Sequence, residues 1–83
     1  MRERAFQHYL SHLQVERGLA SNTVEAYRRD LLEFFSFLTS QQWTIEEVGK
    51  EHLTQYLQHL YERLSVRSVM RKIVSLRSFF RFL

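Results

Sequence analysis

The stretch that decides the fold class is residues 65–83, which read SVRSVMRKIVSLRSFFRFL. Its apolar residues recur every three or four positions, as on one face of an α-helix; they are Val66, Val69, Met70, Ile73, Leu76, Phe80 and Leu83. The same spacing places Arg67, Arg71, Ser75 and Ser78 on the opposite face. Ser65 is predicted to cap the helix, because its hydroxyl can accept from a free amide of the first turn. We therefore expect a helix with one buried face and one basic, exposed face.

The charge of the chain is concentrated in this stretch. Residues 1–64 contain seven basic and nine acidic residues, whereas residues 65–83 contain no acid and five basic residues, namely Arg67, Arg71, Lys72, Arg77 and Arg81. A face of guanidinium groups and small hydroxyls suits a phosphate backbone, and a helix is slim enough to enter a major groove. The alternative is a basic face that contacts only water.

Length and composition limit the remaining possibilities. The 83 residues are expected to form a single domain, residues 1–83. The chain has no cysteine, which excludes disulfides and thiolate metal sites and agrees with a cytoplasmic location. No apolar run approaches the roughly 20 residues that cross a bilayer, and the start lacks the layout of a signal peptide. Proline is absent and the two glycines, Gly18 and Gly49, fall between periodic segments, so we predict an all-α chain with short connections.

Three further helices are predicted, which together make a compact four-helix orthogonal bundle. The first spans about residues 3–17 and ends at Gly18, and the third spans about residues 50–64. The second begins at residues 21–23, with Ser21 or Asn22 as its cap. On its flank, residues 28–30 (Arg-Arg-Asp) are interpreted as a charged surface patch, either paired locally or facing a phosphate near the helix start.

The connections carry weaker signals. Thr44 and Glu47 have the spacing of a capping box. Trp43 is interpreted as a core residue, with stacking on a base as the alternative. Phe79 and Phe82 project toward the flanks of the polar face and are expected to be exposed, unless they pack on the first helix.

No catalytic group or cofactor site is indicated. The acids are scattered, the serines lack a nucleophile-elbow context and no Gly-rich loop is present, so we expect this chain to be no enzyme and to need no cofactor. His8 and His12 are four residues apart and share one helical face. A zinc site would need a third ligand, so we interpret them as a surface pair and expect no metal.

Two segments of the chain resemble a known family. Residues 9–31, with Glu16-Arg17-Gly18-Leu19-Ala20-Ser21-Asn22-Thr23 and Glu25-Ala26-Tyr27-Arg28-Arg29-Asp30-Leu31, are similar to the start of Xer-type tyrosine recombinases and related phage integrases. Residues 64–83, with Leu64-Ser65-Val66-Arg67-Ser68 and Leu76-Arg77-Ser78-Phe79-Phe80, are similar to the end of the same N-terminal domain. The resemblance implies a SAM-like, core-binding domain that clamps double-stranded DNA, while a separate C-terminal domain carries the catalytic tyrosine and its partners.

The resemblance also implies which residues approach DNA. They lie at the start of the second helix and on the exposed face of the fourth, and with flanking basic residues they are Asn22, Thr23, Ala26, Arg28, Arg29, Arg67, Ser68, Arg71, Lys72 and Arg77. Either Arg28 or Arg29 could instead serve the fold. By resemblance, the remaining partners are the C-terminal catalytic domain and neighbouring recombinase protomers on DNA.

Two rival functions remain open at this point. The chain could be a protein-interaction module in which Phe79, Phe82 and the outer face of the first helix meet another protomer. Binding to a membrane surface is weaker, because the apolar side of residues 65–83 is needed for the core.

Overall fold

The computed structural model describes the backbone of residues 2–83 and the side chains of residues 4–83. Every element in this range is helical, which confirms the all-α prediction; in chain order they are α1 (Arg2–Ser11), η1 (His12–Glu16, a π-helix), α2 (Ser21–Gln41), η2 (Ile45–Glu47, a 3₁₀ turn), α3 (Lys50–Tyr61) and α4 (Val66–Phe82). Within this range, no helix combines the length and the apolar character needed to cross a membrane.

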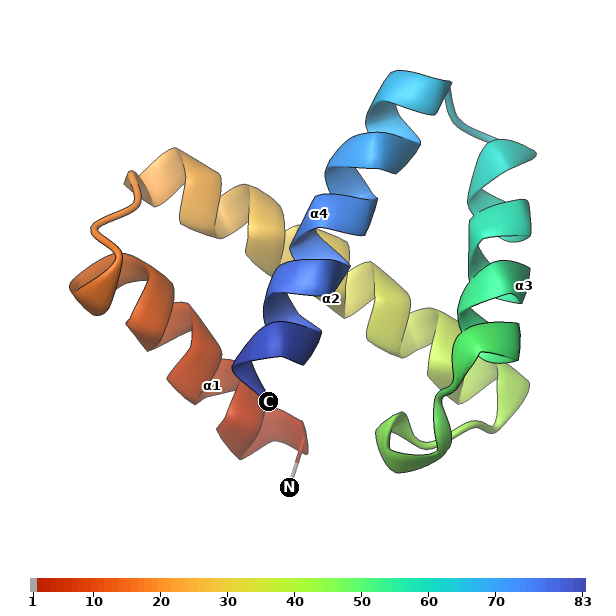
Figure 1. Ribbon diagram of the computed structural model, residues 1–83, viewed down its shortest axis with the longest axis horizontal. Helices are drawn as coiled ribbons and strands as arrows, with labels where there is room; N and C mark the ends of the chain where they lie inside the picture. The colour runs from red at the N-terminus through yellow and green to blue at the C-terminus, as the bar shows by residue number, and fades with distance from the viewer. Residues whose placement is uncertain (1) are drawn as a thin grey trace.

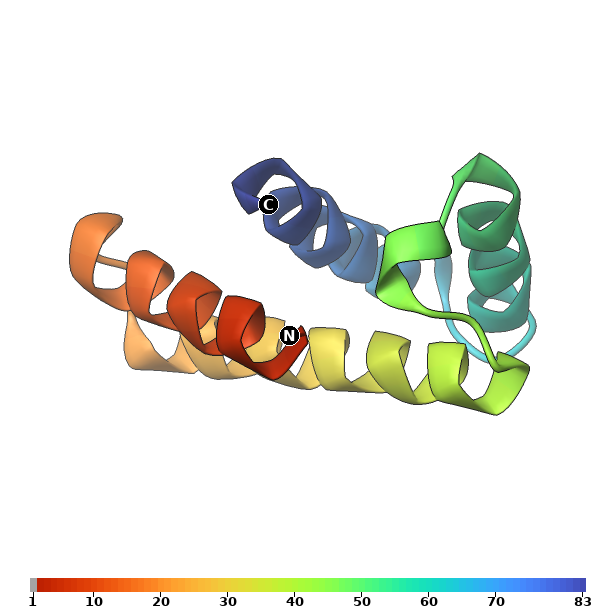
Figure 2. The same cartoon turned by 90° about the horizontal axis from the view of Figure 1, so that it is seen from below.

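The helices form two hairpins that cross. The long helix α2 runs through the whole molecule with α1 folded back along its first half, and α4 crosses over its middle while α3 runs beside α4 (Figure 1). Seen from below, α2 forms the base and the other three helices lie on one side of it (Figure 2). In the view of Figure 1, the first halves of α2 and α4 border the same quadrant of the fold.

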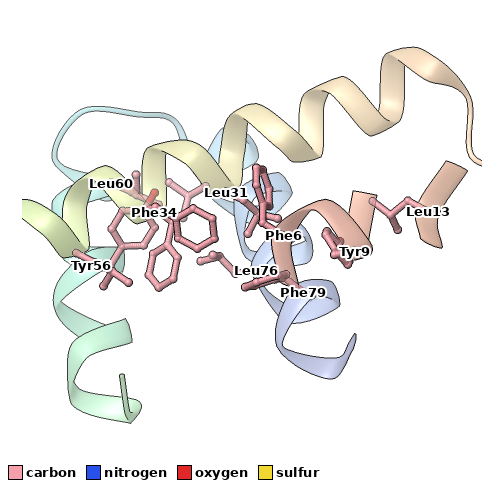
Figure 3. Packing of buried hydrophobic residues seen from close by; sticks show 12 residues of the cluster. Phe6, Tyr9, Leu13, Leu31, Phe34, Tyr56, Leu60, Leu76 and Phe79 are labelled. Atoms are coloured by element: carbon pink, nitrogen blue, oxygen red, sulfur yellow. The ribbon is translucent and has the colours of Figure 1, made fainter. Parts of the chain in front are cut away.

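The core has two aromatic clusters that meet at α4. At one end, Phe34 of α2 packs edge-on against Tyr56 of α3, with ring centroids 5.0 Å apart. At the other, Phe79 of α4 packs against Tyr9 of α1 at 5.2 Å and against Phe35 of α2 at 5.7 Å, and Figure 3 shows Leu76 between the two groups. Each ring is almost fully buried, and burying such a side chain contributes about 1.5–3 kcal/mol.

The turn between α1 and α2 is built on Gly18, whose φ of +63° lies in the left-handed region. The Leu19 amide donates to the Leu13 carbonyl at 3.0 Å, six residues back, which is one residue longer than the long bond of a Schellman turn and follows the wide π-turn of η1. The chain then places Ala20, not Ser21 or Asn22, at the cap of α2, with no side chain bonded to the first turn. The predicted side-chain cap is therefore wrong, because the Gly18 turn fixes where the helix starts.

Other local predictions are confirmed. The amide of Thr44 donates to Glu47 Oε1 at 2.7 Å in the predicted capping box, and the amide of Ser68 donates to Ser65 Oγ at 3.3 Å. Trp43 is half-buried against the core, where its ring lies 5.8 Å from that of Phe37 and 4.4 Å from that of His52, centroid to centroid.

The buried face of α4 is rotated relative to the prediction. Val66 and Met70 were expected in the core but are 64% and 50% exposed, whereas Lys72 and Ser75 are buried. The cause is a carboxylate on α2, described next, which draws polar residues of α4 inward. Phe79 is also core, 1% exposed, so its expected exposure was wrong and the alternative of packing on the first helix holds.

Candidate nucleic-acid interface

The crossing of α2 and α4 is held by one buried carboxylate, Asp30, which is 2% exposed. Its Oδ2 accepts from Arg71 Nη1 at 2.7 Å and from Ser75 Oγ at 2.7 Å, and its Oδ1 accepts from Lys72 Nζ at 3.0 Å. A buried carboxylate needs this many donors to offset the loss of its hydration. We call these four residues the Asp30 cluster.

The Asp30 cluster corrects the picture of a fully exposed basic face on α4. Lys72 is buried and also lies 3.0 Å from Glu33 Oε1, an ion pair without hydrogen-bond geometry, so its charge is committed to α2. Ser75 was expected on the exposed face and is fully buried. Arg71 is tied to Asp30 by one nitrogen, yet its side chain is 49% exposed. Asp30 was also predicted to form a charged surface patch with Arg28 and Arg29, but it is buried.

In the first half of α2, Arg28 and Arg29 have different surroundings. Arg28 binds Glu25 with two nitrogens, Nε to Oε1 at 3.0 Å and Nη2 to Oε2 at 2.8 Å, and this pairing lowers the pKa of Glu25. Arg29 is exposed and makes no ion pair among the side chains that the structure describes. Asn22 and Thr23 are exposed beside it and Ala26 is half-buried.

The exposed basic residues of α4 are Arg67, Arg71, Arg77 and Arg81. Of these, only Arg71 has a carboxylate partner within residues 4–83. Ser68 is half-buried, and its hydroxyl accepts from that of Ser65 at 3.2 Å. The candidate interface thus consists of exposed basic residues on the two helices that cross at the Asp30 cluster, Arg29 on α2 and Arg67 and Arg71 on α4, and it excludes the buried Lys72.

Two features of this region, the Asp30 cluster and η1, were not anticipated, and a third, the packing of Phe82 on the first helix, was expected only as the alternative to an exposed ring. The Asp30 cluster links residues that are 41 to 45 positions apart in the sequence. The one sequence signal that could have predicted it is that Asp30 lies next to the apolar positions of α2. The π-helix η1 has no pattern in the sequence that predicts it. Phe82 is 37% exposed and packs against Tyr9 and His12, with centroids 5.5 and 5.1 Å apart.

The two histidines of the first helix have separate surroundings. His8 is exposed, whereas His12 Nδ1 lies 3.3 Å from Glu16 Oε1. Nowhere in the described part of the chain do three or more histidine, cysteine, aspartate or glutamate side chains gather as a metal ion would require.

Comparison with known proteins identifies this class of fold. Residues 6–83 match the model of the family described as "Phage integrase, N-terminal SAM-like domain". The chain is 41% identical over 83 aligned residues to the tyrosine recombinase XerC of Chlorobaculum parvum, covering 90% of this chain and 25% of that protein. It is 35% identical over 82 residues to the tyrosine recombinase XerD of Staphylococcus aureus, covering 96% of this chain and 28% of that protein. No solved structure matches it significantly.

The chain therefore belongs to the phage integrase N-terminal SAM-like family, and its relatives include tyrosine recombinases. It spans about a quarter of the length of the curated relatives that it matches.

Proposed function

We propose that this chain is the duplex-DNA-binding domain of a site-specific tyrosine recombinase, acting in the cytoplasm, and that it clamps the recombination site without cutting it. The observation that carries the proposal is that α2 and α4 cross at the Asp30 cluster and that both helices carry exposed arginines close to it in sequence, Arg29 on α2 and Arg67 and Arg71 on α4. Membership of the family supports the class of partner. The catalytic groups would come from the C-terminal domain that is implied by the resemblance.

The start of α2 adds a second kind of contact. No side chain caps its first turn, so the amides there remain available to an anion at the positive end of the helix dipole. Asn22 and Thr23 sit on that turn and are exposed, so their polar side chains can contact a phosphate or a base edge. Ala26 lies one turn further on and offers an apolar surface that suits a thymine methyl group.

The arginines divide into different roles. Arg67 and Arg29 lack ion pairs among the described side chains and can neutralise phosphates directly. Arg71 is oriented by Asp30 and still half exposed, so its remaining guanidinium nitrogens are pre-positioned for a bidentate contact with a guanine edge.

A fluorescence-anisotropy titration of random duplex and of candidate half-sites at two salt concentrations tests this function. The Arg29→Glu/Arg67→Glu double variant should bind far more weakly than the parent and lose part of its salt dependence, because phosphate contacts dominate affinity. Lys50→Glu makes the same kind of charge reversal at the start of α3, on the opposite side of the molecule (Figure 1), and should reduce binding less. Unchanged duplex binding by a folded double variant would overturn the proposal.

The rival interaction module has lost part of its basis, because Phe79 is buried in the core. Self-association that is insensitive to salt, without any duplex binding, would favour that rival.

A further inference from the structure

A hollow of about 570 Å³ lies next to the proposed interface, between η1 and the C-terminal half of α4. Three arginines line it, Arg17 at the end of η1 and Arg77 and Arg81 on α4, together with the polar side chains of Tyr27 and Ser78. Val74 and Phe82 of α4 add apolar surface to the same hollow. Among the described residues, those that line the hollow include no aspartate or glutamate. Glu16 does not line the hollow, but its Oε1 lies 3.3 Å from Nδ1 of the lining residue His12.

The arginines approach the hollow from two sides. Arg77 and Arg81 are one helical turn apart and therefore lie on the same face of α4. Arg17 comes from the other wall, where its amide donates to the His12 carbonyl at 3.1 Å and closes the wide π-turn. Such single π-turns are rare inside helices and occur frequently at functional sites. Here the π-turn carries one of the three cations at the hollow.

Ser78 provides an oriented hydrogen-bond donor. The hydroxyl of Tyr9, whose ring is fully buried, donates to Ser78 Oγ at 2.7 Å. Because Ser78 accepts this bond, its own proton is free to be donated to a ligand in the hollow. Burial raises the pKa of Tyr9, so its hydroxyl keeps the proton that it donates to Ser78.

A second hollow has the same two α4 arginines in its lining but lacks the polar partners. It has about 550 Å³ and lies on the other side of α4, against α3. Arg77 and Arg81 reach its edge as well, but its walls are the apolar side chains of Leu53, Leu57 and Ile73. A phosphate there would be desolvated without polar partners, which is unfavourable.

We infer that the hollow between η1 and α4 binds a backbone phosphate of duplex DNA through Arg17, Arg77, Arg81 and Ser78. This inference rests on the proposed function and extends its footprint from the crossing of α2 and α4 to the far end of α4. A phosphodiester fits this hollow because its oxygens can accept from several cationic and hydroxyl donors at once. The inference adds Arg17, Arg81 and Ser78 to the residues that the sequence predicted to contact DNA.

The test measures how the affinity for random duplex depends on salt in single variants. Arg17→Gln and Arg81→Gln should each lower the slope of log affinity against log salt by about 0.9 and weaken binding about five- to tenfold at about 0.1 M salt. Arg17→Lys should keep most of the slope, because the charge is retained. Lys50→Gln removes one positive charge at the start of α3, a helix that contributes no side chain to this hollow, and should leave the slope nearly unchanged.

The outcomes separate this inference from the proposed function. If the parent binds no duplex, the proposed function fails and the inference fails with it. If the parent binds duplex and the Arg29→Glu/Arg67→Glu variant is impaired, but Arg17→Gln and Arg81→Gln keep the parental slope, only the inference is overturned. Denaturation curves should show that both glutamine variants remain folded, since neither arginine makes an ion pair within residues 4–83.

Discussion

The two halves of α4 use the same residue types for different purposes. In the first half, Arg71, Lys72 and Ser75 are bound to the buried carboxylate of Asp30 on α2. In the second half, Arg77 and Arg81 have no carboxylate partner among the described side chains and stand between two hollows. A helix can therefore carry five positive charges of which only some are available to a ligand, and the count of charges overstates its basic surface.

The substitution with the largest expected effect on stability is Asp30→Ala, which tests the role of the first half of α4. Removing the carboxylate leaves Lys72 buried with Glu33 as its remaining partner, so the free energy of unfolding should fall by about 3 kcal/mol. Urea denaturation followed by circular dichroism measures the change. Glu25→Ala deletes an exposed carboxylate of the same helix and should leave the unfolding midpoint near that of the parent. A loss equal to that of the control would show that Asp30 does not hold the crossing.

In the second half of α4, Ser78→Ala should cost about 1–2 kcal/mol of stability, because it leaves the buried Tyr9 hydroxyl without its acceptor. Tyr9→Phe in the same background removes the unsatisfied hydroxyl and should recover part of that loss. A thermal-denaturation double-mutant cycle measures the coupling. Additive effects of the two changes would contradict the hydrogen bond on which the donor role of Ser78 depends.

High pH should weaken the end of the core that lies beside the Asp30 cluster. Burial raises the pKa of Tyr56, and the nearby carboxylates of Glu33 and Asp30 raise it further. An unfolded tyrosine ionises near about pH 10, so above that pH the unfolded state loses a proton that the folded state retains. Stability should thus be unaffected by Tyr56 below about pH 10 and then fall by up to about 1.4 kcal/mol per pH unit.

Tyr56→Phe isolates this effect, since it removes the titrating hydroxyl and keeps the ring packed on Phe34. Urea midpoints measured on both sides of about pH 10 should then show a shallower decline than in the parent. Equal declines would assign the alkaline sensitivity to other groups.

The smallest expected effect compares two arginines of α4. Arg71→Gln should lower stability by about 1 kcal/mol, because its ion pair is half exposed and Asp30 keeps Lys72 and Ser75. Arg77→Gln should stay within about 0.5 kcal/mol, as is usual for a surface substitution. Chemical denaturation under identical conditions gives both values. Equal losses of stability in the two variants would contradict the proposed difference between the two halves of α4.

Most of the fold could be predicted because it follows from local periodicity. The apolar spacing and the position of Gly18 predict the helices and the first turn, and Thr44 with Glu47 predicts the capping box. The α2 cap was mispredicted because Ser21 and Asn22 are both good capping residues, whereas the left-handed Gly18 and the extended Ala20 decide where the helix begins.

The site was harder to predict because its geometry depends on contacts between distant residues. A helical projection assigns Ser75 to the polar face, and it cannot include a carboxylate on another helix that draws Lys72 inward. Arg28 and Arg29 are indistinguishable by pattern, and only the position of Glu25 in space separates them. The position of Arg67 depends on no contact with a distant residue, and its predicted exposure is confirmed.

The separation of Asp30 from its partners along the chain has a consequence for biosynthesis. Arg71, Lys72 and Ser75 follow it by 41 to 45 residues, and Phe79, which closes the packing over Tyr9 and Phe35, comes later still. A nascent chain that has emerged only as far as α3 holds an unneutralised carboxylate and uncovered aromatic rings. We therefore expect the domain to fold cooperatively only once α4 has left the ribosome, and until that moment its aromatic side chains stay in contact with water.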